Sequence, residues 1–284
     1  MHSVVCIKQV PDSAQIRVHP VTNTIMRQGV PTVINPYDLF AIEEALRLRD
    51  RLGGTVTVLT MGPPSAEESL RKALTFGADR AVLLTDRFFA GSDTLATSYA
   101  LAQALRKIGE SWGPPDLVFT GKQTIDGDTA QVGPGIARRL GLNQLTYVAG
   151  IDALDLGAGI ITVRRRSEGG VQELTTRLPA LITMLEGTNE IRRGRVADAL
   201  RAARAEVTIW NAAQAGITEL TLCGLRGSPT VVKRVFAPTA RAETAAFIEL
   251  RDQTPADIAE ALLAEITTRL PGIEDELLRH AAGY

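Results

Sequence analysis

The sequence predicts an α/β fold: a doubly wound, mostly parallel sheet with helices on both faces. Strand-like runs alternate with helix-like segments four times between Val4 and Leu140. Such an alternation implies right-handed crossovers between parallel strands. Most of the runs, such as Thr55–Thr60 (TVTVLT), are apolar throughout rather than alternating with polar residues. That composition is typical of strands buried on both faces.

The first elements follow from short local signals. Val4–Ile7 is a β-branched apolar run that predicts a buried strand, and Pro11-Asp12 predicts the turn after it. Residues 15–27 alternate loosely around a turn signal and predict an exposed hairpin. Asn35 and Pro36 predict the start of a helix, because Asn is a good N-cap and Pro is favoured at the first helical position.

The alternation then repeats. Strands are expected at 55–60, 80–84 and 116–120, and helices at 65–76, 94–108 and 129–140. Gly53-Gly54 and Gly77 follow two of the expected helices. Glycine is the residue that most often ends a helix, so these positions support the boundaries.

After Leu140 the runs become shorter. Strands are expected at 145–153, 160–166, 172–177 and 181–184, and we expect these four to form an antiparallel extension. A short basic helix at 197–205 precedes a strand at 207–210, and residues 224–238 look like a loop. The amphipathic run 255–270 predicts a late helix that ends before Pro271-Gly272.

The composition excludes several classes of protein. Lys and Arg number 31 and Asp and Glu 32, a near-balance that argues against a dedicated nucleic-acid binder. Cys6 and Cys223 lie far apart and the three histidines are not clustered, so we expect neither a disulfide scaffold nor a metal site. No run reaches the roughly 20 apolar residues of a membrane span, and no targeting peptide is evident. We therefore expect a cytoplasmic protein with no membrane span.

A candidate ligand site follows from the expected sheet. Ligands of open parallel sheets bind at the carboxyl ends of the strands, where loops lead into helices. Four such loops are polar or rich in glycine: 8–11, 60–63, 91–94 and 121–129. We expect them to line one nucleotide pocket. Backbone N–H groups at Thr94 and Thr129, as helix amino ends, would meet its phosphates.

Plainer interpretations exist for most of these loops. On spacing alone, Ser92-Asp93-Thr94 is a helix cap, Gly62-Pro63 a turn, Lys8 a solvated charge and Cys6 a core residue. The loop GKQTIDGDTAQ at 121–131 is a stronger signal, because it combines two glycines, two carboxylates and a capping Thr at a strand end. It is not a Walker A loop, and no GxGxxG motif or Ser/His/Asp constellation is present. The residues alone therefore indicate an α/β protein that binds a nucleotide, and they leave its reaction open.

Several short motifs, in a fixed order along nearly the whole chain, point to one family. They are Lys8–Asp12 (KQVPD), Val33–Pro36 (VINP), Glu43–Leu46 (EEAL), Ala73-Leu74 with Gly77–Arg80 (GADR), Gly121–Gln123 (GKQ), Ile125–Thr129 (IDGDT), Leu178–Ala180 (LPA), and Asn189-Glu190 with Arg192. Together they resemble the β subunit of electron-transfer flavoproteins. Three further stretches, 29–38, 91–98 and 224–230, look like the bifurcating and nitrogen-fixation-associated branch.

This resemblance implies an adenine-nucleotide-hydrolase-like domain over residues 1–235 and a C-terminal arm over 236–284. The arm would contact the flavin-bearing α subunit of a heterodimer, and the chain would oxidise NADH only in that heterodimer. In the bifurcating branch the β pocket holds FAD, with NADH as electron donor. In the common branch it holds AMP, a structural ligand, in a conventional subunit that docks donors of the acyl-CoA dehydrogenase type. FAD is the expected cofactor here and AMP the alternative.

The loops and the resemblance together single out candidate cofactor-binding residues. They are Cys6, Lys8, Asn35, Tyr37, Asp38, Thr60, Met61, Gly62, Asp93, Thr94, Thr97, Gly121, Lys122, Gln123, Ile125, Asp126, Gly127, Asp128, Thr129, Ala130, Gln131 and Val132. Lys8 and Lys122 would offset phosphate charge, while Asp93 would cap a helix or accept from a ribose hydroxyl. We expect Gln123, Asp126, Asp128 and Gln131 to fix adenosine and ribose. No catalytic side chain is expected.

The resemblance also implies a docking segment for acyl-CoA dehydrogenase or quinone oxidoreductase-type redox partners. Its residues are Asn189, Glu190, Arg192 and Val196. Val196 stands where the family has an anchoring leucine. Ile191 stands where the family usually has proline, and the segment Arg192–Arg195 is more basic than in the family, which puts the identity of the partner in question.

Overall fold

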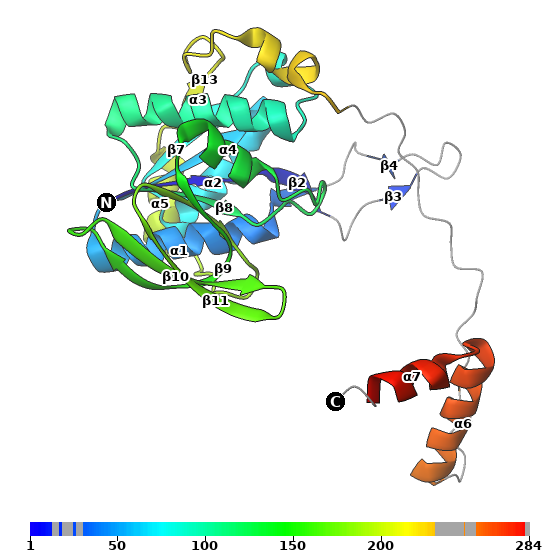
Figure 1. The fold of residues 1–284 in the computed structure, drawn as a ribbon. Coiled ribbons are helices and arrows are strands. Elements are labelled where there is room, and N and C mark those ends of the chain that lie inside the picture. Colours follow the sequence, from blue (N-terminus) through cyan, green and yellow to red (C-terminus); the bar gives the residue numbers. More distant parts are fainter. Residues whose placement is uncertain (13–16, 19–24, 27–30, 231–246, 248–253, 282–284) are drawn as a thin grey trace. The chain divides into compact units, whose positions relative to one another are not determined.

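A computed structural model describes residues 1–12, 17–18, 25–26, 31–230, 247 and 254–281. The chain divides into two compact units, Met1–Ala237 and Pro238–Tyr284. The first unit contains a nine-stranded sheet and the helices that cover it (Figure 1). Among the described helices, none is long and apolar enough to cross a membrane.

The sheet has the strand order β11-β10-β9-β12-β8-β1-β6-β7-β13. Its strands are β1 (His2–Cys6), β6 (Thr55–Met61), β7 (Arg80–Leu84), β8 (Leu117–Gly121), β9 (Asn143–Asp155), β10 (Ile160–Ser167), β11 (Gly170–Arg177), β12 (Ala180–Met184) and β13 (Thr208–Trp210). Pairing is parallel from β9 through β12, β8, β1, β6 and β7 to β13, and antiparallel among β9, β10 and β11. The predicted α/β fold class is confirmed.

Helices cover both faces of this sheet. They are α1 (Pro36–Leu52), α2 (Glu67–Phe76), α3 (Thr94–Trp112), α4 (Val132–Leu140) and α5 (Val196–Arg204), with short 3₁₀ turns η2 (Pro64–Ala66), η3 (Arg87–Phe89), η4 (Leu220–Leu222) and η5 (Gly224–Gly227). One core forms under α1, α2 and α5, the other under α3 and α4. In the central strand β1, Val5 enters the first core, and Val4 and Cys6 enter the second. This two-sided burial explains why the strand is apolar at successive positions.

The order of the strands creates a crevice beside β1. The chain runs from β1 to β6 and β7 on one side, and α3 then leads back to β8 on the other side of β1. At such a reversal the connections leave adjacent strands in opposite directions, so their carboxyl ends border an open crevice. The loops after β1 and β8 therefore flank the switch point of this sheet.

The predicted starts of two helices and the predicted position of one strand in the sheet were wrong. The strand predicted at 181–184 is β12, which is parallel to β8 and β9 and inside the main sheet rather than in the antiparallel extension. All five of its residues are buried, as a strand between two neighbours requires, whereas β10 and β11 expose much of their length. The helix predicted to begin at Thr129 begins at Val132, because Asp128 and Ala130 adopt left-handed backbone angles with φ of 50° and 55°. The helix predicted at 65–76 begins as the turn η2 before α2.

Several smaller elements escaped the sequence patterns. β2 (Gln9–Pro11) pairs antiparallel with β5 (Thr32–Ile34), where only a turn was predicted. Within the predicted hairpin, β3 (Arg17–Val18) pairs with β4 (Ile25–Met26), and the rest lies outside the described residues. The predicted loop 224–238 begins as η5, and its part from 231 onward is likewise outside them.

The second unit contains α6 (Pro255–Arg269) and α7 (Ile273–Ala281), of which only α6 was predicted. Thr254 and Asp257 form a capping box at the start of α6, a strong local helix signal. Among the residues of this unit that the structure describes, five large apolar side chains are exposed: Phe247, Leu262, Leu263, Leu270 and Leu278.

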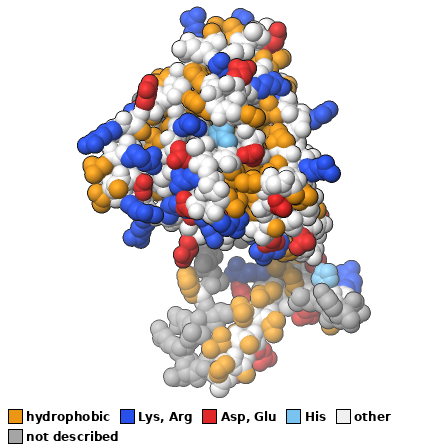
Figure 2. Space-filling view, turned by 90° about the vertical axis from the view of Figure 1, so that its left-hand side faces the viewer, with side chains coloured by type: hydrophobic (Ala, Val, Ile, Leu, Met, Phe, Trp, Pro, Cys, Tyr) orange, Lys and Arg blue, Asp and Glu red, His pale blue; other side chains and the backbone are white. Residues whose placement is uncertain are grey.

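On the face of the molecule shown in Figure 2, acidic and basic side chains are interspersed with apolar ones. That distribution matches the formal net charge of −1.

Candidate functional site

Asp38, in the first turn of α1, joins the two strand ends that border the crevice. Its Oδ2 accepts the Lys8 N–H at 2.8 Å, and its Oδ1 accepts the Gly121 N–H at 3.0 Å. The side chain is buried, and burial raises its pKa to about 7, although hydrogen bonds from Asn35 and from the Lys8 and Gly121 amides oppose this shift. Asp38 therefore holds the ends of β1 and β8 together from behind the crevice.

Asn35 supports the loop after β8 from behind. It occupies the N-cap position of α1, as predicted, but its side chain makes no capping hydrogen bond. Instead Nδ2 donates to the Gln123 carbonyl at 2.9 Å, and Oδ1 accepts the Ile125 N–H at 3.2 Å. Asn35 is fully buried, so these two bonds shape the loop without exposing the side chain to a ligand.

Gly121 allows the end of β8 to approach α1 closely. A Cβ atom at this position would lie 2.5 Å from Asp38 Oδ1 and 2.6 Å from Tyr37 Cβ. No other residue fits such an approach without moving the backbone. The glycine of the GKQ motif is thus required for the close packing of β8 against α1.

The loop 121–131 presents polar groups towards solvent. Gln123 Nε2 donates to Asp128 Oδ1 at 2.7 Å, and Asp128 and Ala130 adopt left-handed backbone conformations. In a loop, residues with left-handed backbone angles can point successive N–H groups into one shallow concavity, and such a concavity suits an anion. Gln131 Oε1 accepts the Thr94 hydroxyl at 2.8 Å, which ties this loop to the amino end of α3.

The amino end of α3 is capped by Asp93. Its Oδ1 accepts the N–H groups of Leu95 and Ala96, and its Oδ2 accepts both the N–H and the hydroxyl of Thr230. Although burial opposes it, this set of hydrogen bonds lowers the pKa of Asp93. Of the two roles predicted for Asp93, the structure shows the capping role, and the first-turn amides available to a ligand are correspondingly fewer.

Two lysines flank the crevice, each with a carboxylate. Lys8 Nζ lies 2.7 Å from Asp126 Oδ2, and Lys122 Nζ lies 3.4 Å from Glu186 Oε2. Lys122 also lies over the Tyr37 ring, 4.9 Å from its centroid. Burial opposes a lower pKa for Asp126, but the hydrogen bond and the charge of Lys8, together with a hydrogen bond from Thr124, outweigh it and lower that pKa.

The other predicted ligand positions are distributed around the same edge. Cys6 is buried, and burial raises its thiol pKa to about 12, so only its backbone is available to a ligand. The Thr60 hydroxyl donates to the Ile7 carbonyl at 2.8 Å and is fully buried, so it does not face the crevice. Thr129 is not a helix amino end, as the late start of α4 shows. Further positions lie on the bordering elements: Met61 at the end of β6 with Gly62 after it, Thr97 in α3, Gly127 in the loop and Val132 at the start of α4.

The donor set at this edge fits a nucleotide. It combines backbone amides of a left-handed loop, the start of α3, two lysines and the side chains of Gln123 and Gln131. Amides and ammonium groups suit phosphates, and carboxylates such as that of Asp126 suit ribose hydroxyls. The strand order brings these donors and acceptors to one edge of the sheet, where a nucleotide could contact them together.

Two residues of the segment predicted to dock partners, Asn189 and Arg192, bind α1. Asn189 Nδ2 donates to the Phe40 carbonyl and to Glu44. Arg192 donates to Glu43 through Nε at 2.8 Å and Nη2 at 3.0 Å, and to Asp50 through Nη1 at 2.7 Å.

Only the other two predicted docking positions face outward. Glu190 is exposed, and Val196 is 78% exposed at the start of α5. Sequence reasoning missed the carboxylates that bind Arg192. The one signal was the pair Glu43-Glu44 among the apolar residues of an amphipathic helix.

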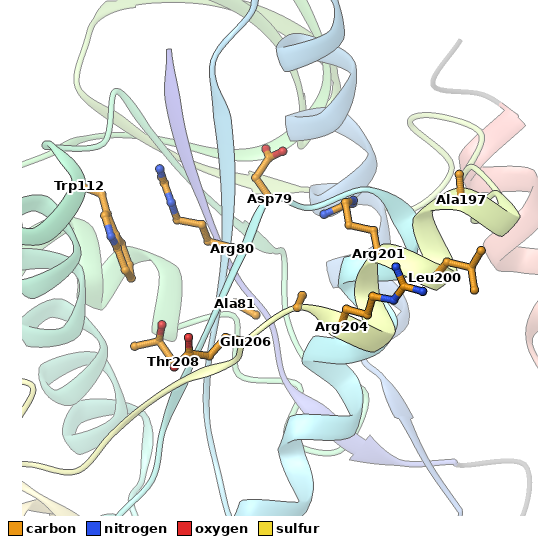
Figure 3. Close-up of a pocket in the computed structure, with 11 residues that line it drawn as sticks. Asp79, Arg80, Ala81, Trp112, Ala197, Leu200, Arg201, Arg204, Glu206 and Thr208 are labelled. Carbon is orange, nitrogen blue, oxygen red and sulfur yellow. The ribbon is translucent and has the colours of Figure 1, made fainter.

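A separate hollow of about 810 Å³ lies at the amino ends of β7 and β13, away from the nucleotide edge (Figure 3). It is lined by Asp79, Arg80, Ala81, Trp112, Ala197, Leu200, Arg201, Arg204, Ala205, Glu206 and Thr208. None of these residues was singled out as a ligand from the sequence.

The fold and the site define a nucleotide-binding α/β subunit, and comparison with known proteins gives its family. The family model described as "Electron transfer flavoprotein domain" matches residues 22–215, and the chain belongs to this family. It is similar to Protein FixA of Azorhizobium caulinodans, with 75% identity over 284 residues covering 100% of both chains. Protein FixA of Azotobacter vinelandii is 64% identical over 281 residues, covering 99% of this chain and 100% of that one.

The electron transfer flavoprotein subunit beta of Clostridium acetobutylicum is 46% identical over 234 residues, which cover 82% of this chain and 87% of that one. These similarities place the chain among the β-type subunits of electron-transfer flavoproteins, a class that works with an α subunit. They also confirm the resemblance to the nitrogen-fixation-associated branch.

Proposed function

We propose that this chain, as the β subunit of a cytoplasmic heterodimer, binds FAD at the switch-point crevice and accepts electrons from NADH. The electrons would pass in a bifurcating manner to the α-subunit flavin and to partner acceptors. The observation that carries the proposal is the convergence on one edge of the loops after β1 and β8 and the amino end of α3, linked by the Thr94–Gln131 hydrogen bond. Bound FAD would supply hydride acceptance and one-electron transfer, and the chain itself supplies binding and orientation.

The choice of FAD over AMP rests on the number of donors at the crevice. A dinucleotide pyrophosphate needs more donors than a monophosphate, and the Thr94 N–H at the start of α3, which Asp93 does not cap, adds one to those of the loop 121–131. Lys8 and Lys122 stand on either side to offset the charge, each already partly neutralised by a carboxylate. AMP, as a structural ligand of a conventional β subunit, would use many of the same groups and stays the alternative.

The nucleotide content of the purified heterodimer decides between the two. We expect two FAD per heterodimer, with bleaching of the flavin absorbance when NADH is added. The measurement is the visible spectrum together with chromatography of the released nucleotides. One FAD and one AMP, without oxidation of NADH, would show that the bifurcating assignment is wrong and that the AMP alternative holds.

The second unit of the chain is proposed to contact the α subunit. Its two helices expose apolar side chains such as Leu262, Leu263 and Leu278, which a partner would bury. We expect deletion of the residues after Pro238 to abolish most co-purification with the α subunit. Circular dichroism of the truncated chain serves as the control for folding. Undiminished complex formation by the truncated chain would remove the arm from the interface.

Val196 is proposed to anchor redox partners of the acyl-CoA dehydrogenase or quinone oxidoreductase type. An exposed apolar side chain among arginines suits an apolar pocket on an acidic surface, with charge steering the encounter. Val196→Asp should slow electron delivery at limiting partner concentration by about tenfold, or about 1.4 kcal/mol. Nucleotide content should not change, and Val196→Leu, which keeps an apolar anchor, should retain delivery. Equal rates for Val196→Asp and the unchanged heterodimer would contradict the assignment.

A further inference from the structure

α5 carries exposed apolar side chains on a firmly held helix. Val196 is 78% exposed and Leu200, one turn later, is 57% exposed. On its other side the helix buries Ala202 against α2, and Arg201 donates to the carbonyls of Ala78 and Leu74 at 3.0 and 3.3 Å. These contacts hold α5 in place on its inner side. Its outer face is therefore a preformed surface, and binding a partner does not require the helix to become ordered first.

The hollow of about 810 Å³ continues this surface. Figure 3 shows Leu200 and Arg204 of α5 on one side of it and Trp112, at the end of α3, on the other. The guanidinium of Arg80 lies 5.4 Å from the centroid of the Trp112 ring, and Trp112 stacks on Trp210 with centroids 5.9 Å apart. The hollow thus offers apolar contact area and positive charge together, the composition of binding hot spots.

The charge around α5 is locally positive, although the whole chain is nearly neutral. Arg192 and Arg201 have acidic partners. Within the part of the chain that the structure describes, the side chains of Arg193, Arg195 and Arg204 form no ion pair or hydrogen bond. Glu206 and Asp79 also line the hollow, and Asp79 is bound by Arg49 at 3.1 Å. Inside the hollow itself, Arg80 and Arg204 make no described ion pair, against the single unpaired carboxylate of Glu206, so the remaining charge favours an acidic occupant.

We propose that this hollow receives an acidic segment of the redox partner protein, as a second anchor beside Val196. Apolar side chains of that segment would pack against Leu200 on one side of the hollow and Trp112 on the other, and its carboxylates would meet Arg204 and Arg80. A small anion alone would leave Val196 and Leu200 exposed, whereas a protein surface covers both with the hollow. The inference rests on the docking function proposed for Val196 and extends it from one residue to the face of α5.

The test uses the heterodimer with Leu200→Asp or Arg204→Glu and a purified quinone oxidoreductase-type partner. Each variant should raise the KM for the partner about tenfold, with kcat at saturating partner and nucleotide content unchanged. Arg204→Glu should also reduce the dependence of the rate on salt, because a steering charge is lost. Leu200→Met and Arg204→Lys are the matched controls and should keep KM within about twofold of the parent.

Comparison with Val196→Asp separates this inference from the docking function on which it rests. If Val196→Asp raises KM and the two variants at the hollow do not, the hollow is not used and the docking function stands. If none of the three raises KM, the docking function fails as well. Loss of co-purification with the α subunit in Leu200→Asp or Arg204→Glu would assign the hollow to the heterodimer interface, and binding of free inorganic phosphate with no effect on KM would make it a small-anion site. Either result overturns the proposal.

Discussion

Replacing Arg192 by alanine is expected to lower the free energy of unfolding by about 2–4 kcal/mol, below the full cost of breaking a buried ion pair because the Arg192 side chain is itself 24% exposed. Arg192 donates two side-chain hydrogen bonds to Glu43, and hydrogen bonding to Glu43 raises the pKa of Arg192 above its usual value. Glu43 is only 4% exposed, so the substitution leaves a buried carboxylate without its counter-charge. Urea unfolding of the purified chain measures the loss.

Arg193 supplies a matched control for this substitution. It is the next residue, it is exposed, and its side chain has no described partner, so Arg193→Ala should change stability by no more than about 0.5 kcal/mol. Glu43→Gln tests the charge itself, because it keeps the shape of the partner. If Arg192→Ala and Arg193→Ala cost the same, Arg192 does not stabilise the packing of the docking segment on α1, and its side chain is free to contact partners directly.

Asp38→Asn is expected to destabilise the chain by about 2–3 kcal/mol at neutral pH and to weaken nucleotide retention. The carboxylate accepts one backbone N–H from each strand end of the crevice. An amide side chain can accept only one of them, and its NH₂ group would face the other donor. Denaturant unfolding and the nucleotide content of the heterodimer measure the two effects.

The pH dependence of this difference has a defined sign. The pKa of Asp38 is about 7 in the folded chain and near 4 when unfolded, so between these values the folded state binds more protons. Stability contributed by this group is therefore full below about pH 4 and is lost as pH rises towards 7. The asparagine variant lacks this slope, so its deficit relative to the parent should be larger at pH 5 than at pH 7.5.

Asp126→Asn is the control at the same edge. Its pairing with Lys8 is exposed, with about a third of the Asp126 side chain accessible, so its loss should cost no more than about 1 kcal/mol. A deficit of Asp38→Asn that is constant between pH 5 and 7.5 would show that Asp38 is charged throughout and that its hydrogen bonds outweigh the effect of burial.

The sequence by itself determined the fold class and the edge at which the candidate site lies. Strands such as β1 and β6 are apolar at successive positions because both faces are covered, and that pattern is visible without coordinates. Once the strands are parallel, the loops after their carboxyl ends must share one edge, so the grouping of Lys8 with the loop 121–131 follows from topology. Local signals also placed the starts of α1 and α3, where Asn35-Pro36 and Asp93 stand.

Only the tertiary structure decided what individual polar side chains do. Arg192 binds Glu43, 149 positions away in the chain, a contact that the sequence did not indicate, and Asn35 supports Gln123 and Ile125 instead of capping its own helix. β12 was placed in the wrong part of the sheet for the same reason, since strand order depends on which neighbours bury it. Local propensity and periodicity depend on residues a few positions apart, whereas these outcomes depend on contacts that exist only after the chain has folded.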